Sequence, residues 1–206
     1  PTLLNNGYGE HNIQGIGDKH VPLIHNVMNT DFVVGISDQA TNNLNLMFNT
    51  DVGKKYLISK KGFDNNFVNR LPEFGFSTIA NILASIKLAK YMKLGSDDAI
   101  ITVATDGADL YLSELQKTKE DSTGIYDETA CAEIYGQYLK GISTDNTLEL
   151  NQKEKERIFN LGYYTWVEQQ GVDINEFEKR RDQSFWNDHH NYMLSLDNRI
   201  KEFNSM

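Results

Sequence analysis

The chain has 206 residues, of which 39% are hydrophobic and 24% charged, and its formal net charge is −9 at pH 7. This acidic balance argues against non-specific binding to nucleic acid or to anionic membranes, because both need a basic face. No apolar run approaches the roughly 20 residues of a membrane span, and no signal-peptide pattern opens the chain. Cys131 is the only cysteine, which excludes an intrachain disulfide and a thiolate metal cluster. We expect a cytoplasmic protein with neither nucleic-acid nor membrane partners.

The first part of the chain is predicted to alternate strands and helices. The first 30 residues are rich in glycine and polar residues and are expected to form a loop with one short extended piece. Residues 31–37, DFVVGIS, are an apolar run bounded by turn signals, typical of a strand buried on both faces. Asp38 suits the N-cap of the following helix, because its carboxylate accepts free N–H groups of a first turn. A second helix is expected over residues 51–61 and an irregular connection over residues 62–74.

The strongest helix signal lies between Ser77 and Gly95. Its apolar positions recur at three- and four-residue spacing, which indicates one buried helix face, and they are Ile79, Ile82, Leu83, Ile86, Leu88, Ala89 and Met92. The next buried strand is expected over residues 99–104, AIITVA. This order of strand, helices and strand favours a mostly parallel sheet with helices packed on its faces. We therefore predict an α/β fold.

The character of the chain changes after Gly107. Residues 108–146 alternate short helical patterns with polar turns, and from Asn151 onward the chain is helix-forming and heavily charged. Aromatic residues in that last part fall at helical spacings and are interpreted as packing anchors: Phe159, Tyr163, Trp166, Phe177, Phe185 and Trp186. We expect an α/β domain over residues 1–110 and a mainly helical extension packed on it over residues 111–206.

Four segments carry a likeness to known proteins. Gln14–Pro22 is QGIGDKHVP, Val34–Thr41 is VGISDQAT, Gly75–Gly107 joins a glycine–serine turn to a long helix and an apolar run, and Glu156–Gly171 is ERIFNLGYYTWVEQQG. The first three resemble, in order, segments from the carboxyl-terminal half of fold-type-II pyridoxal-phosphate enzymes. This is the tryptophan synthase β superfamily, which includes cysteine synthase and cystathionine β-synthase. The fourth is similar to the helical tail of a bacterial cysteine-synthase-like subgroup, so the likeness extends over nearly the whole chain.

This resemblance implies a partial tryptophan synthase β-like fold, with residues 1–110 as the carboxyl-terminal part of a domain that binds pyridoxal 5′-phosphate. It also implies a lyase or transferase that acts on a small amino-acid substrate by β-elimination or β-replacement, commonly as a homo-oligomer. The family's Schiff-base lysine and phosphate loop would lie upstream of Pro1, so no catalytic residue is assigned in this chain. Pro1 is interpreted as the cut edge of a longer protein, and an N-terminal half or a partner subunit is expected to supply the lysine.

The resemblance also places cofactor-binding residues at the beginning of the chain and of its longest helix. Gly15, Ile16 and Gly17 would line the pocket beside the cofactor ring, because glycine allows close approach of the backbone. The alternative is a plain tight turn. Ser77 matches a serine of the family's Gly-x-Ser-Ser-Gly helix start, but Ile79 replaces the final small residue. The alternative for Ser77 is a cap of the helix without contact to a ligand.

A third set of candidates follows the apolar run 99–104. In the related enzymes a hydroxyl side chain at this place bonds the pyridine nitrogen of the cofactor. Counting from the end of the predicted strand places this hydroxyl at Thr105, whereas counting back from Tyr111 places it at Gly107, which has no side chain. Asp106 is the alternative partner of the pyridine nitrogen, since a carboxylate would keep that nitrogen protonated. Alternatively, Asp106 only caps the next helix.

Two other functions stay open. The chain can be a non-catalytic subunit that completes a partner's pocket without the lysine, or a Rossmann-like nucleotide-binding module. No Gly-x-Gly-x-x-Gly directly joins a strand to a helix, which weighs against the nucleotide-binding module. No metal site is expected, because the spacings of His11, His20 and His25 match no zinc pattern.

Overall fold

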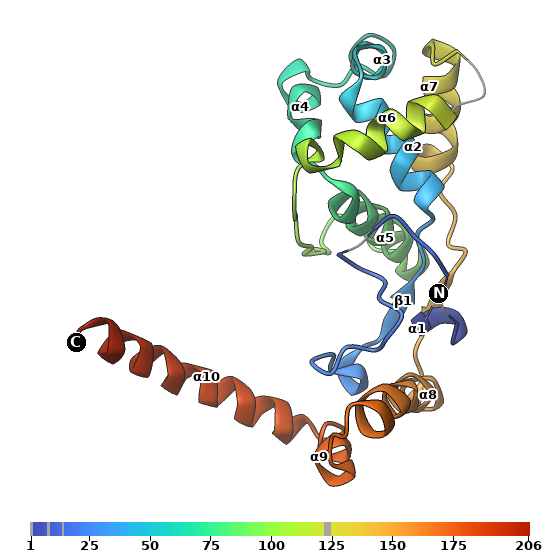
Figure 1. The fold of residues 1–206 in the computed structure, drawn as a ribbon. Coiled ribbons are helices and arrows are strands. Elements are labelled where there is room, and N and C mark those ends of the chain that lie inside the picture. The colour runs from blue at the N-terminus through green and yellow to red at the C-terminus, as the bar shows by residue number, and fades with distance from the viewer. Residues whose placement is uncertain (1, 8, 14, 122–124) are drawn as a thin grey trace. The chain divides into compact units, whose positions relative to one another are not determined.

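The structure of the chain is a computed structural model that describes residues 2–7, 9–13, 15–121 and 125–206. Helices account for 64% of the chain, and the described residues form one sheet of two antiparallel strands (Figure 1). The predicted α/β fold with a mostly parallel sheet, as in a partial tryptophan synthase β-like fold, is therefore wrong. A buried parallel sheet needs several adjacent strands with helices on both faces, and the described residues do not supply them.

The two strands are β1 (Phe32–Val34) and β2 (Thr147–Glu149), which lie far apart in sequence. β1 is shorter than the strand predicted over residues 31–37, and none of its three residues is fully buried. Beyond the pair, the N–H of Leu150 donates to the carbonyl oxygen of Asp31 at 2.8 Å. The apolar run was correctly identified as a strand, but its partner is set by the tertiary fold rather than by the neighbouring sequence.

Residues 99–104, predicted to be a buried strand, form neither a helix nor a strand. Their apolar side chains face outward: Ile101 is 96% exposed and Val103 is 67% exposed. The segment is held through its backbone, since Asn81 Nδ2 donates to the carbonyl oxygen of Val103 at 2.9 Å. A strand needs a partner for its backbone groups, and none of the described segments pairs with this run.

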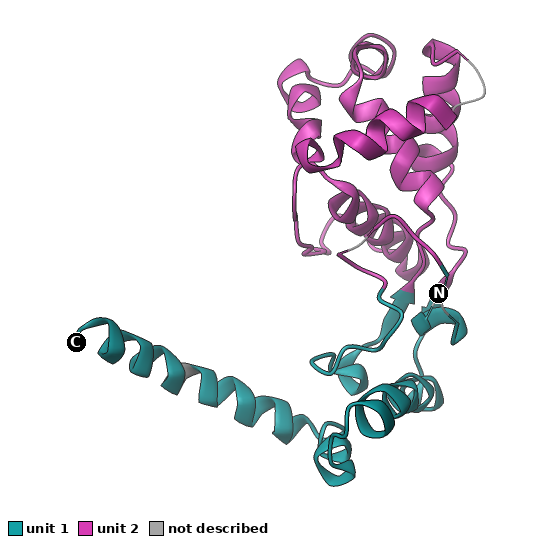
Figure 2. Ribbon diagram, in the orientation of Figure 1, with its two compact units in different colours: residues 1–9, 18–33, 148–206 teal, residues 10–17, 34–147 magenta. Residues whose placement is uncertain are grey.

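The chain divides into two compact units (Figure 2). Unit 1 comprises residues 1–9, 18–33 and 148–206, and unit 2 comprises residues 10–17 and 34–147. Each unit combines segments that are far apart in sequence, and each contains a hydrophobic core of its own.

Unit 2 is built from helices. They are α2 (Asp38–Asn49), α3 (Asp51–Lys61), α4 (Asn65–Arg70), η2 (Leu71–Glu73), α5 (Phe76–Met92), η3 (Ala108–Tyr111), α6 (Leu112–Asp121), α7 (Glu128–Tyr135) and η4 (Gly136–Lys140). The predicted helices over 51–61 and from Ser77 are confirmed as α3 and α5. The connection predicted over residues 62–74 contains α4, whose local signal is the N-cap Asp64.

Side-chain caps begin several of these helices. Thr50, Asp64 and Asp127 accept N–H groups of the first turns of α3, α4 and α7. The cap of α2 is Ser37 rather than the predicted Asp38. The Asp38 carboxylate accepts the N–H of Asn12 at 2.9 Å, so it fastens the loop 10–17 to the start of α2.

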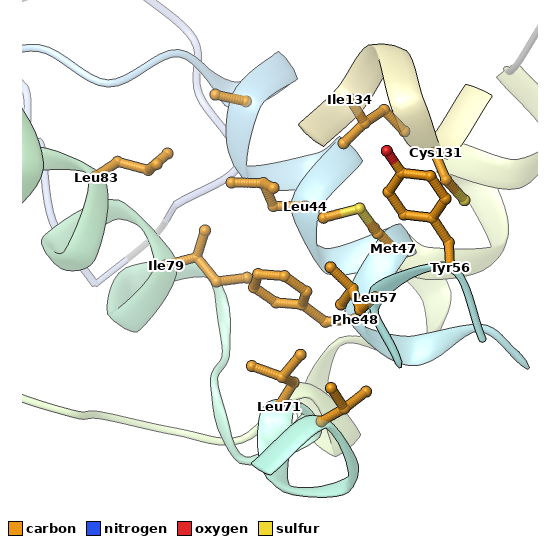
Figure 3. Close-up of a cluster of buried hydrophobic side chains, with 12 residues drawn as sticks. Leu44, Met47, Phe48, Tyr56, Leu57, Leu71, Ile79, Leu83, Cys131 and Ile134 are labelled. Atoms are coloured by element: carbon orange, nitrogen blue, oxygen red, sulfur yellow. The ribbon is translucent and has the colours of Figure 1, made fainter. Parts of the chain in front are cut away.

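The core of unit 2 lies between α2, α3, α5 and α7. Figure 3 shows Leu44 of α2 beside Ile79 and Leu83 of α5, while Met47 of α2 lies on the side of α7; all four side chains are buried. Among the described residues, the buried members of this core are Ala40, Leu44, Met47, Phe48, Tyr56, Leu57, Val68, Leu71, Ile79, Leu83, Cys131 and Ile134. Cys131, the only cysteine, is thus a packed core residue.

A buried lysine of α5 holds two distant segments of unit 2. Lys87 Nζ donates to Asp145 Oδ1 at 2.8 Å and to the carbonyl oxygen of the same residue at 2.7 Å. It also donates to the carbonyl oxygen of Gly35 at 3.4 Å. The Lys87 hydrogen bond, and next that of Ser143, keeps the pKa of Asp145 below its ordinary value. This one ammonium group therefore ties the residues beside β1 and β2 to α5.

The Asp145 carboxyl predicts a specific acid response. Its folded-state pKa is depressed, so the stabilisation is complete above its ordinary pKa of 3.8 and is lost as the pH falls through the lower folded value. We expect Lys87→Met to flatten the dependence of the urea unfolding midpoint on pH in this acid range. The control is Lys117→Met, which changes an exposed lysine of α6. If the urea unfolding midpoint of Lys87→Met depended on pH in the acid range as strongly as that of the wild type, the prediction would be contradicted.

Unit 1 is also mainly helical. Its helices are α1 (Thr2–Asn5), η1 (Val27–Asn29), α8 (Gln152–Tyr163), η5 (Tyr164–Gln169), α9 (Ile174–Lys179) and α10 (Gln183–Asn204). The helix-forming character predicted from Asn151 onward is confirmed. Asn151, Asp173 and Asp182 cap α8, α9 and α10 by accepting first-turn N–H groups.

Aromatic side chains form much of the core of unit 1. Phe159 of α8 and Phe177 of α9 are buried with their ring centroids 4.7 Å apart. Trp166 packs against the same core and donates through Nε1 to the carbonyl oxygen of Val21 at 2.7 Å. The interpretation of these aromatic residues as packing anchors is confirmed for Phe159, Phe177 and Trp166. None of the described helices combines the length and apolar character that crossing a bilayer requires.

Candidate functional site

Two segments predicted to contribute to one site meet at the amino-terminal end of α5. This helix begins at Phe76, and Gly75 is its N-cap without a side-chain hydrogen bond. The N–H of Gly75 donates to the carbonyl oxygen of Asp106 at 2.8 Å. One residue earlier, the N–H of Thr105 donates to Thr78 Oγ1 at 2.9 Å. The chain after the exposed run 99–104 therefore lies along the first turn of α5.

Hydroxyl groups gather at this contact. Thr78 Oγ1 lies 3.3 Å from Thr105 Oγ1, and Thr78 is buried. Ser77 is only 5% exposed, and a Cβ atom placed on Gly15 would lie 3.1 Å from Ser77 Oγ. That separation is tighter than ordinary van der Waals contact, so a side chain at Gly15 would push against the serine. The N-cap of α5 is Gly75, and neither Ser77 nor Thr78 provides a side-chain cap, as the alternative interpretation of Ser77 required.

Asp106 is held by an aromatic side chain. Tyr111 OH donates to Asp106 Oδ2 at 3.3 Å, and its ring meets that of Phe76 edge-on with centroids 4.9 Å apart. Burial, and then the charge of Asp106, raises the pKa of Tyr111, so this tyrosine is a neutral donor at pH 7. The next helix, η3, has Gly107 as its N-cap without a side-chain bond. The interpretation of Asp106 as a helix cap is therefore wrong.

The loop 10–17 is the third segment and is anchored by one apolar residue. Ile13 is buried in a small cluster with Phe76 and Ala80 of α5. This contact sets Gly15 against Ser77. The anchoring isoleucine was not among the predicted site residues, since a single apolar residue in a polar loop carries no signal of its destination.

The remaining glycine-loop candidates are not joined to the cluster. Ile16 is partly exposed, and Gly17 has a φ of 76°, the left-handed conformation that favours glycine. Its carbonyl oxygen accepts a hydrogen bond from His11 Nε2. Among the described residues, no hydrogen bond connects Ile16 or Gly17 to α5, and Gln14 lies outside the described residues. The tight-turn interpretation of Gly17 is consistent with this geometry.

We use the name α5 cluster for Gly15, Ser77, Thr78, Thr105 and Asp106. An open depression of about 550 Å³ lies at Gly107, the residue after Asp106. It is lined by Asn49, Pro72, Glu73, Gly107, Ala108, Asp109 and Leu112. Gly107, the rival position for the pyridine-nitrogen partner, therefore faces a solvent-accessible hollow, but it offers only backbone groups there.

A second cavity lies in the core of unit 2 and has different chemistry. Its volume is about 180 Å³, and only apolar side chains line it: Leu44, Phe48, Leu57, Phe63, Phe67, Val68, Leu71, Phe74, Ile79, Ile82, Leu83 and Leu139. With no polar group to orient a substrate, it offers nothing for acid–base or cofactor chemistry. The polar α5 cluster is therefore the better candidate for function.

Sequence reasoning pointed to Thr78 together with Ser77 but missed the contact of Thr78 with Thr105 and that of Tyr111 with Asp106. Thr78 directly follows Ser77 in the glycine–serine turn, so its position was available as a signal. Its hydroxyl accepts the Thr105 N–H because the two segments lie side by side, which only the fold decides.

Other reactive side chains are poor candidates for chemistry. Burial raises the pKa of the Cys131 thiol, which donates to Tyr126 OH at 3.3 Å. A protonated, buried thiol is a weak nucleophile. Among the described residues, no group of three or more His, Cys, Asp or Glu side chains is arranged to hold a metal ion.

Comparisons with protein-family models, curated proteins and solved structures gave no significant match for this chain. The pyridoxal-phosphate resemblance therefore depends on the sequence motifs alone.

Proposed function

We propose that this chain contributes part of the active site of a pyridoxal-phosphate-dependent lyase or transferase. The reaction would be β-elimination or β-replacement on a small amino acid. The observation that supports this proposal is the α5 cluster. Gly15 comes from the first motif of the resemblance, and Ser77 and Thr105 come from the two ends of the third motif, yet they lie together at one helix start.

The cluster offers partners for one edge of the cofactor. Pyridoxal phosphate, when bound, supplies an electron sink for the carbanion at the α-carbon of the amino acid. Thr105 would place a hydroxyl at the pyridine nitrogen and leave that nitrogen largely unprotonated, which suits elimination. The Asp106 carboxylate already accepts the Tyr111 hydroxyl, which favours Thr105 for this role. Gly15 lets the loop backbone lie close to Ser77, where even a Cβ atom would be only 3.1 Å from Oγ.

The cluster lacks other groups that the chemistry needs. No lysine belongs to it, and the buried lysine of α5, Lys87, is committed to Asp145 and Gly35. We therefore propose that an N-terminal half or a partner subunit supplies the lysine and the phosphate loop. On this proposal the chain alone does not turn over amino acids. Robust β-elimination by the purified chain would contradict this division of the active site.

The role of Thr105 can be tested with pyridoxamine 5′-phosphate. This compound keeps the ring nitrogen and the phosphate but has no aldehyde, so it forms no imines with surface lysines. We expect it to raise the thermal unfolding midpoint of the wild type and to bind Thr105→Val about five- to tenfold more weakly, the effect of one lost hydrogen bond. The substitution keeps the backbone N–H that donates to Thr78 Oγ1.

Thr118→Val is the matched control, because its hydroxyl donates only to the carbonyl oxygen of Glu114 within α6. Parallel titrations with NAD and ATP test the nucleotide-binding alternative. A midpoint shift from a nucleotide, without one from pyridoxamine phosphate, would contradict the proposal. Equal affinities of wild type and Thr105→Val would contradict the assignment of Thr105.

A further inference from the structure

Unit 1 contains a buried arginine with two guanidinium nitrogens that have no hydrogen-bond partner among the described residues. Arg180 follows α9 directly and is only 5% exposed. Its Nε and Nη1 atoms are both buried, and neither has a hydrogen-bond partner among the described residues. Burying a charge without pairing it is costly, and breaking a buried pair typically costs several kcal/mol for the same reason. A guanidinium in this state needs a physical explanation.

The surroundings of Arg180 orient the guanidinium but do not neutralise it. The group lies over the rings of Phe159 and Phe177, with its central carbon 5.5 and 4.9 Å from their centroids. The adjacent Arg181 instead takes the carboxylates of Glu156 and Glu178. In the described part of the chain, no acidic side chain forms an ion pair with Arg180. Burial alone accounts for the lowered pKa of its guanidinium.

The pKa of His25 is sensitive to the charge of Arg180. Burial, and then the charge of Arg180, lowers the pKa of His25, whose Nε2 lies 2.9 Å from Thr30 Oγ1. The imidazole is therefore mainly neutral at pH 7. An anion next to Arg180 would offset the positive charge that His25 senses and would raise the pKa of His25.

We propose that Arg180 is the centre of a binding site for a small molecule bearing an oxyanion, a phosphate or a carboxylate group. The planar guanidinium offers a fork of N–H donors that matches either group, and the two aromatic rings hold that fork in place. The oxyanion would satisfy the buried donors and neutralise the charge. The chain carries a net charge of −9, so its overall field does not favour anions and the site must act through local geometry. The inference does not depend on the proposed function.

The test uses inorganic phosphate as the probe and follows the thermal unfolding midpoint of the whole chain. Sodium chloride at matched ionic strength serves as the reference. We expect phosphate to raise the wild-type midpoint above this reference, as a ligand that binds the native state does. Arg180→Met keeps an apolar side chain over the two rings, and we expect it to bind phosphate at least about tenfold more weakly. Without phosphate, this variant is expected to be as stable as the wild type.

Arg70→Met is the matched control, because Arg70 is exposed and paired with Glu73. It should keep the full response to phosphate. A parallel titration with acetate distinguishes the two oxyanions: the larger shift identifies the preferred group, and either result supports the site. Equal phosphate shifts in wild type and Arg180→Met would overturn the proposal.

A measurement on the wild type keeps the proposal testable even if Arg180→Met does not fold. The pKa of His25 is followed by NMR with and without saturating phosphate. We expect phosphate to raise it, because the bound anion offsets the Arg180 charge. The four other histidines serve as internal references. A His25 pKa that shifts no more than the others do would overturn the proposal.

Discussion

Gly53→Ala is expected to destabilise unit 2 by about 3 kcal/mol or more, among the largest effects of a single methyl group in this chain. A Cβ atom on Gly53 would lie 1.9 Å from the carbonyl oxygen of Met47 and 2.7 Å from its carbonyl carbon. These are backbone atoms, so no rotamer change relieves the clash. α2 and α3 would have to separate, although Thr50 serves as the last cap of one and the first cap of the other. Urea unfolding measures the loss.

Gly136→Ala is the matched control for this substitution. Gly136 has a helical φ of −62°, and nothing lies within 4 Å of a Cβ placed on it. Alanine should therefore be tolerated and should stabilise the chain by about 0.5–1 kcal/mol, since it has the higher helix propensity and restricts the unfolded chain. Similar destabilisation by both substitutions would show that the α2–α3 contact is not as close as described.

Phe159→Ala is expected to destabilise unit 1 by about 3–5 kcal/mol. The ring is buried against Phe177, and the guanidinium carbon of Arg181 lies 4.0 Å from its centroid. Removing it leaves a cavity under two arginines and loses both the aromatic and the cation–π contacts. Hydrogen exchange should show the loss of protection in α8 and α9.

Phe203→Ala removes the same side chain from an exposed position. Phe203 lies near the end of α10 and is 71% exposed, so its truncation should change the free energy of unfolding by no more than about 0.5 kcal/mol. If the two alanine substitutions had equal effects, the aromatic core of unit 1 would not hold the unit together.

The sequence predicted the helices well because their signals are local. The periodic apolar positions after Ser77 and the polar residues that precede α3, α8 and α10 act within a few residues of each helix. The N-cap of α2 was displaced by one residue because Asp38 is used by Asn12, a contact between distant parts of the chain. α4 was missed although Asp64 caps it, since its single turn and a half carries too little periodicity.

The strand predictions were less accurate because the formation of a strand depends on residues far away in the sequence. The run 99–104 has the composition of a buried strand, yet a strand exists only where a second one pairs with it. β1 pairs with β2 (Thr147–Glu149), and no local sequence pattern indicated this pairing. Secondary structure with non-local hydrogen bonds therefore escaped a prediction made from composition, and the α/β fold class failed with it.

For the α5 cluster and for Arg180, too, the sequence supplied the residues and the fold supplied their surroundings. The identities of Gly15, Ser77, Thr105 and Asp106 came from sequence motifs, but the fold alone brought them to one end of α5. Arg180 and Arg181 are identical neighbours in the sequence, and nothing in their local pattern separates them. Arg181 is paired with two carboxylates on the surface of α8 and α9, whereas Arg180 is buried over aromatic rings without a counter-charge among the described residues. Sequence determined which charges are present; tertiary packing decided which of them is left to be neutralised, because the cost of a charge depends on what surrounds it.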